Sequence, residues 1–73
     1  MKMTEEAMKL QEGLSIGLKE MGIQKDTSIA IALMLRTENQ LLTMLDWIVK
    51  HTEENPSEDR VLRIAQRISE EVK

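Results

Sequence analysis

The chain has 73 residues, a net charge of −3 at pH 7, six methionines, a single aromatic residue and no cysteine. This length predicts one domain, residues 1–73, and the lack of cysteine excludes disulfides and most zinc sites, so the domain must be stabilised by helix packing, by self-association or by both. The excess of acidic residues disfavours binding to nucleic acid, and the longest apolar run, seven residues, is far shorter than the roughly 20 residues of a membrane-spanning helix.

The amino-terminal segment turns acidic within Met1–Glu6 and has no apolar core of the signal-peptide type. We therefore expect a cytoplasmic protein without a membrane segment. Glycine, proline and the capping residues divide the rest of the chain into four predicted helices.

The first helix is predicted at residues 4–21, with Thr4 as its N-cap and Gly22 as its left-handed stop. Apolar residues recur at spacings of three and four, which places them on one face: Ala7, Leu10, Leu14, Leu18 and Met21. Ile16 points away from this face, and glycines at positions 13 and 17 could let another helix approach closely. A loosely optimised helix and a dimer contact through Ile16 both fit this pattern.

The second helix, predicted at residues 27–36 with Asp26 or Thr27 as its cap, contains the seven-residue run Ile29–Leu35. A helix that is apolar on every side must be enclosed by its neighbours or by a second subunit. Because a chain this short can hardly enclose a helix, the run predicts a homodimer. Its expected contact residues are Ile31, Met34 and Leu35.

The third helix is predicted at residues 37–51, since Thr37 and Gln40 form the pattern of a capping box. The alternative is one continuous helix from Asp26 to His51, because no glycine or proline intervenes. The expected core residues, flanked by Met44, are Leu41, Leu42, Leu45, Ile48 and Val49.

Trp47 lies off the apolar face of this third helix. It can cover the edge of the core beside Leu62 of the last helix, or it can serve as a binding hot spot, where tryptophan is enriched.

The fourth helix is predicted at residues 57–72, after a loop around Pro56 and with Asn55 or Ser57 as its cap. Its apolar face comprises Val61, Ile64, Ala65, Ile68 and Val72. The opposite face carries Arg60, Arg63 and Arg67, with the expected ion pairs Asp59–Arg63 and Arg67–Glu71. The predicted fold is thus all-α, a compact bundle of four short helices.

Residues suited to catalysis are scarce. His51 is the single histidine and ends the third helix, where an imidazolium favours the negative end of the helix dipole. A metal site from His51, Glu53 and Glu54 has no recognisable ligand spacing. We therefore expect no enzyme activity, no cofactor and no metal.

Residues 18–27, from Leu18 to Thr27, resemble the turn of bacterial helix-turn-helix proteins. That resemblance implies a nucleic-acid-binding regulator. In that case the apolar run would be the helix that enters the major groove. A helix in that position reads base edges with polar and basic side chains, but the first arginine here is Arg36, after the end of the run. A second possible phosphate contact is the arginine face of the last helix.

Residues 21–51 are similar to ubiquitin-associated domains, three-helix modules that bind protein. The likeness rests on Met21-Gly22-Ile23, Thr37, Asn39, Asp46-Trp47-Ile48 and His51. It implies a protein-binding patch, although Ile23 stands where those domains have an aromatic residue. The implied patch residues are Met21, Gly22, Ile23 and Trp47.

The order of motifs from Gly22 to Val72 resembles that of short uncharacterised helical proteins of Gram-positive bacteria and their mobile elements. This order comprises the Gly-Ile turn, the apolar helix, the Arg-Thr-x-x-Gln step, the Met-Leu-Asp-Trp helix and the Asn-Pro-Ser-Glu turn. The resemblance implies a fold and a bacterial source, and it implies no activity.

The sequence as a whole predicts a non-enzymatic protein-interaction module that self-associates through apolar helical surface as a homodimer, with another protein as a further possible partner. The alternatives are a nucleic-acid-binding regulator and a purely structural homodimer with no further partner. The candidate interaction residues are Ile16, Met21, Gly22, Ile23, Ile31, Met34, Leu35 and Trp47.

Overall fold

The computed structural model describes residues 4–73 and contains four α-helices and one short 3-10 turn. Their bounds are α1 Glu5–Glu20, α2 Lys25–Met34, α3 Glu38–His51, η1 Thr52–Glu54 and α4 Glu58–Glu71. This confirms the predicted all-α four-helix bundle. The predicted start of the acidic amino-terminal segment, Met1–Met3, lies outside the described residues.

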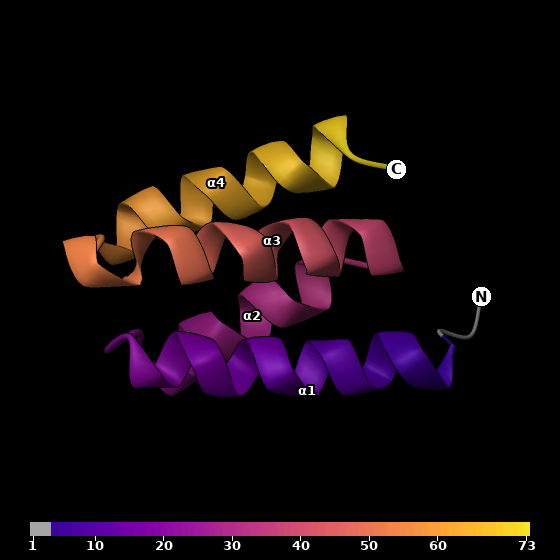
Figure 1. The fold of residues 1–73 in the computed structure, drawn as a ribbon, viewed down its shortest axis with the longest axis horizontal. Coiled ribbons are helices and arrows are strands. Elements are labelled where there is room, and N and C mark those ends of the chain that lie inside the picture. Colours follow the sequence, from indigo (N-terminus) through magenta and orange to yellow (C-terminus); the bar gives the residue numbers. More distant parts are fainter. Residues whose placement is uncertain (1–3) are drawn as a thin grey trace.

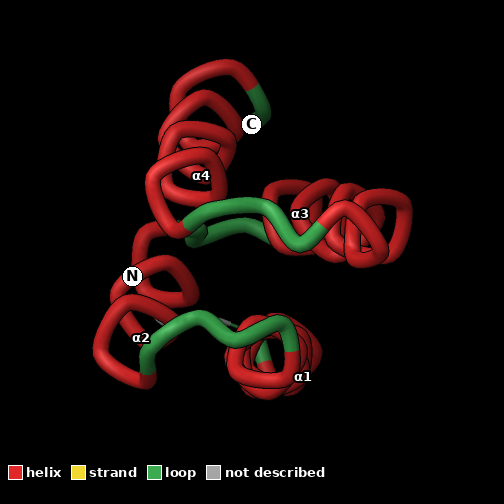
Figure 2. Tube along the Cα trace, turned by 90° about the vertical axis from the view of Figure 1, so that its left-hand side faces the viewer, coloured by secondary structure: helices red, strands yellow, loops and turns green. Residues whose placement is uncertain are grey.

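The helices form a closed square in which α1 packs on α2 and α3, and α4 packs on the same two helices. Figure 1 shows α1 and α3 running in the same direction with their first turns at the same end of the molecule. Figure 2 looks along α1 and shows α2 and α4 together on one side, opposite α1 and α3. Each helix therefore buries one stripe toward the centre and keeps the opposite stripe on the outside.

Most helix ends form as their capping residues predict. The Thr4 side chain accepts a hydrogen bond from the Ala7 amide at 3.0 Å, and the Ser57 side chain accepts one from the Arg60 amide at 3.2 Å. Gly22 has a φ of 94°, the left-handed conformation that ends α1 at little cost only for glycine.

The start of α2 differs from the prediction. The helix begins at Lys25, its N-cap is Gln24, and no side chain caps it. Neither Asp26 nor Thr27 is the cap, because the extended backbone of Gln24 already starts the first turn. The buried Ser28 hydroxyl reinforces this turn by donating to the Gln24 carbonyl at 2.9 Å.

Helices α2 and α3 are separate, which excludes the continuous-helix alternative. The capping box at Thr37 and Gln40 is present, and Leu35 is already extended. The Gln40 Oε1 atom accepts from the amides of Arg36 at 2.8 Å and Thr37 at 3.2 Å. The Gln40 side chain therefore accepts hydrogen bonds from backbone amides that, in a continuous helix, would donate to backbone carbonyls of the preceding turn.

The amide nitrogen of Gln40 ties the same turn to the end of α4. Its Nε2 atom donates to the carbonyls of Ser69 at 3.2 Å and Val72 at 2.7 Å. Gln40 is only 8% exposed, so one buried polar side chain links the α2–α3 turn to the last helix.

The core consists of aliphatic side chains from all four helices. It comprises Ala7, Leu14, Leu18, Ile23, Ile31, Ala32, Leu35, Leu41, Met44, Ile48, Val61, Ala65 and Ile68. Partly buried side chains, among them Leu10, Leu45, Trp47 and Leu62, pack around it.

Two residues expected in the core of α3 are on the surface instead. Leu42 is 51% exposed and Val49 is 75% exposed, whereas Met44, expected at the flank, is fully buried. The reason is geometric, because α3 has two adjacent apolar stripes with the same spacing. One stripe consists of residues 41, 44 and 48 and faces the centre of the bundle, whereas the other consists of residues 42, 45 and 49 and does not.

The loop before α4 turns through Asn55, whose φ of 48° is left-handed. The predicted pair Arg67–Glu71 is present at 4.0 Å. Among the ion pairs of residues 4–73 the predicted pair Asp59–Arg63 does not occur; Arg60 instead reaches back to Glu54 at 3.1 Å.

Candidate interaction surfaces

Six large hydrophobic side chains are exposed within residues 4–73, and their positions define the candidate surfaces. They are Met8, Ile16, Ile29, Leu33, Leu42 and Val49. Five of them flank a contact between two helices, and the sixth, Ile16, lies on the outer face of α1. Folded proteins routinely expose single apolar residues, so only a cluster of exposed apolar side chains indicates an interaction surface.

The first surface, the α1–α2 patch, consists of Met8, Ile29 and Leu33. These side chains line a shallow hollow of about 220 Å³ together with Gln11, Glu12, Ser15 and Ala32. The Gln11 side chain donates to the Ala32 carbonyl at 2.7 Å and so fixes the floor between the helices. Leu33, 62% exposed, is the most prominent of the three.

The second surface, the α1–α3 seam, runs along the contact of the two parallel helices. One end is lined by Glu6, Lys9, Leu10, Glu38 and Leu42. The other end is lined by Gly17, Glu20, Met21, Leu45, Ile48, Val49 and Thr52. The helical repeat places Gly13 between the two ends.

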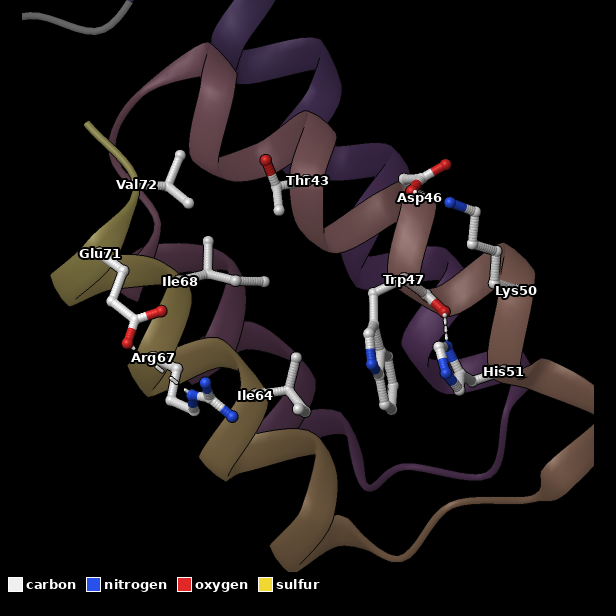
Figure 3. Close-up of a pocket in the computed structure, with 10 residues that line it drawn as sticks. All are labelled: Thr43, Asp46, Trp47, Lys50, His51, Ile64, Arg67, Ile68, Glu71 and Val72. Carbon is white, nitrogen blue, oxygen red and sulfur yellow. Dashed lines mark hydrogen bonds and ion pairs between the residues drawn. The ribbon is translucent and has the colours of Figure 1, made fainter.

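The third surface, the α3–α4 groove, has a volume of about 370 Å³ and contains the tryptophan (Figure 3). Its apolar wall is formed by Trp47, Ile64, Ile68 and Val72, and its polar rim by Thr43, Asp46, Lys50, His51, Arg67 and Glu71. On this rim Asp46 pairs with Lys50 at 2.9 Å and Arg67 with Glu71 at 4.0 Å. Most charged side chains on this rim therefore already have a partner of opposite charge within the chain.

Trp47 is held from two sides. Its ring stacks on His51 with centroids 4.4 Å apart, and the Arg60 guanidinium lies 5.6 Å from its centroid, within the range of a cation–π contact. The His51 Nδ1 atom donates to the Trp47 carbonyl at 2.8 Å (Figure 3). Trp47 thus packs at the edge of the core, between α3 and α4.

The structure places the candidate residues of α2 differently from the prediction. Ile31 and Leu35 are fully buried and Met34 is partly buried, so the outward apolar surface of α2 is carried by Ile29 and Leu33 instead. The physical reason is that both faces of the run are apolar, and the face with Ile31 and Leu35 is the one that packs on α1 and α4.

The four residues implied by the likeness to ubiquitin-associated domains do not form one surface. Ile23 is buried in the core and Gly22 is exposed in the turn. Met21 lies in the α1–α3 seam, whereas Trp47 faces α4 from the other side of α3. The remaining candidate, Ile16, is 49% exposed.

The surface residues that sequence reasoning missed are Met8, Ile29, Leu33, Leu42 and Val49. The i, i+4 spacing of Ile29 and Leu33 and the i, i+7 spacing of Leu42 and Val49 are helical signals for a shared face. These signals do not say whether the face points inward or outward.

His51 is the one histidine of the chain, and its Nε2 atom lies 3.9 Å from a Glu54 oxygen. Across the described part of the chain, no three His, Cys, Asp or Glu side chains are grouped so that they could hold a metal ion. No described helix combines the length and the apolar character that crossing a bilayer demands.

No protein-family model matches the chain, and no curated protein and no solved structure is significantly similar to it. The three surfaces themselves are therefore the basis on which a function can be proposed for this chain.

Proposed function

We propose that this chain is a non-enzymatic protein-interaction module that self-associates as a homodimer through the α1–α2 patch. The observation that carries the proposal is that Met8, Ile29 and Leu33 are all exposed around one hollow. Ile29 and Leu33 belong to the apolar run, and the described part of the chain leaves both side chains exposed. Burying them against a second copy removes that surface from water.

The charged residues on the same face support the association of two copies of this chain. Glu12 lines the hollow, and Lys19 lies seven residues further along α1 on the same helical face. In a two-fold dimer the same patch faces itself, so the acidic position of one copy can approach the basic position of the other.

The dimer is expected to be weak. An interface of standard size buries about 800 Å² on each partner, which is roughly a sixth of the 5116 Å² surface of this chain. Three exposed side chains supply only part of that area, and flanking polar residues must supply the rest. We therefore expect dissociation constants in the micromolar range or above.

Sedimentation equilibrium over a series of protein concentrations tests this proposal. The wild type should shift from monomer to dimer, and Leu33→Glu should stay monomeric because it places a charge in the contact. Val49→Glu is the matched control, since it changes another exposed apolar residue outside the patch and should dimerise like the wild type. A wild type that is monomeric throughout, or equal loss in both variants, would refute the proposal.

Nucleic-acid binding is supported less well by the residues. Beyond Lys25, α2 contains no basic residue, so it offers no cationic face to phosphates. In the arginine face of α4, Arg60 and Arg67 both have acidic partners within the chain.

A further inference from the structure

We propose that the α1–α3 seam is a docking site for a basic amphipathic helix of another protein, which goes beyond self-association through the α1–α2 patch. The seam presents a continuous apolar stripe, because Leu42, Leu45 and Val49 follow the i, i+3, i+7 spacing of one helical face. Val49 is 75% exposed and Leu42 is 51% exposed, so residues 4–73 leave this stripe uncovered.

The shape of the seam fits a helix. Leu10 and Leu42 line a hollow at one end, and Met21 and Val49 line another at the opposite end. The two helices run side by side in the same direction (Figure 1). Because α1 has 16 residues, the seam is about 24 Å long at 1.5 Å per residue, which matches a partner helix of about four turns.

The glycines of α1 leave room for close approach along this length. Apart from its chain neighbours and the backbone of its own helix, a Cβ atom built on Gly13 or on Gly17 would meet no described atom within 4 Å. Small residues on one helix face let the backbone of a second helix come near and pack its side chains around them. An apolar groove between two helices is also a frequent binding mode for an amphipathic helix.

The charges at the seam select the partner. Among the described residues that line the seam, Glu6 and Glu38 lie at one end and Glu20 at the other, and the one basic residue is Lys9. None of these four residues takes part in an ion pair within residues 4–73. A second copy placed on the seam would bring acidic residues to acidic residues, whereas lysines or arginines flanking an apolar stripe would complement them. The occupant is therefore a basic helix rather than another copy of this chain.

The test uses a fluorescent 16-residue peptide that carries leucines on one helical face and lysines beside them, and a second peptide with glutamate in place of each lysine. Fluorescence anisotropy should show that the lysine peptide binds the wild type at least tenfold more tightly than the glutamate peptide. Raising the salt concentration should weaken the binding of the lysine peptide, because the rim charges are exposed.

Variants locate the binding. Val49→Glu should weaken binding of the lysine peptide at least tenfold, and Gly17→Leu should do the same by filling the seam while retaining a stable helix. Leu33→Glu, which lies outside the seam, should bind like the wild type even when it no longer dimerises. Circular dichroism melting verifies that each variant is folded.

Equal binding of the two peptides, or wild-type binding by folded Val49→Glu, would overturn the proposal. The proposal would also be overturned if Val49→Glu no longer dimerised but still bound the lysine peptide, since that result would assign the seam to a second copy. The peptide-binding outcomes do not depend on dimerisation through the α1–α2 patch, so the two proposals can fail separately.

Discussion

Replacing Gln40 by alanine should destabilise the bundle more than any other single change of a polar side chain. Gln40 accepts from the amides of Arg36 and Thr37 and donates to the carbonyls of Ser69 and Val72. Alanine removes all four hydrogen bonds at once. The change therefore weakens both the separation of α2 from α3 and the attachment of the end of α4.

The magnitude follows from these contacts. A hydrogen bond contributes about 1 kcal/mol net, and a buried group left without its partner costs about 1–3 kcal/mol. Ser69 and Val72 are partly exposed, so water can replace some of what is lost, and we expect a decrease of about 2–3 kcal/mol. A domain of this size has a total stability of about 4–11 kcal/mol, so the loss is a large fraction of it.

Urea unfolding followed by Trp47 fluorescence and by circular dichroism measures this change. Gln66→Ala, at an exposed position of α4, is the control and should change stability little. Gln40→Glu keeps the two acceptor contacts but loses both donor contacts, so it too should destabilise. A loss below about 0.5 kcal/mol for Gln40→Ala would refute the assignment of Gln40 as the link between the α2–α3 turn and α4.

The same urea measurement checks four further changes. Gly13→Ala should raise the free energy of unfolding by about 1 kcal/mol, because the site is open and alanine favours the helix; a decrease would contradict this. Gly22→Ala should lower it by about 1–2 kcal/mol, because φ is 94°; no change would be inconsistent with a left-handed stop. Thr4→Ala should cost about 1 kcal/mol through loss of the cap, and an unchanged midpoint would argue against it. Leu41→Ala should cost about 2–5 kcal/mol, because Leu41 is fully buried; a smaller loss would mean that the core collapses around the gap.

Local signals were enough to predict the element order and most helix ends. Thr4, Thr37 and Ser57 each cap a helix through their own hydroxyl, and this interaction depends on residues only three positions apart. The stop at Gly22 is equally local. Such features can be read from a sequence because no distant part of the chain is needed to form them.

The candidate surfaces were less predictable, because the choice between two apolar faces depends on distant helices. On α3 the stripe with Leu41 and the stripe with Leu42 have the same spacing, and the positions of α1 and α4 determine which one is buried. On α2 the residues on both faces of the run are apolar. Sequence reasoning chose Ile31 and Leu35 for the outside, and the packing on α1 and α4 buried them.

The long-range polar contacts escaped prediction for a related reason. Arg60 pairs with Glu54 across the turn at Asn55 rather than along its own helix. The spacing rule for helix pairs describes a straight helix surface and contains no information about a preceding turn. The contacts of Gln40 with Ser69 and Val72 are likewise set by the tertiary fold.

Both described ends of the chain are fastened to the first turn of α3. The Thr4 hydroxyl donates to Glu38 at 2.8 Å, and the Asn39 side chain donates to the Lys73 carbonyl at 3.1 Å. A short flexible linker between Thr4 and Lys73 should therefore leave the bundle undisturbed, and new ends can be opened at the exposed turn near Asn55. Such a circular permutant would keep every helix while converting the loop before α4 into the point where a fusion partner is attached.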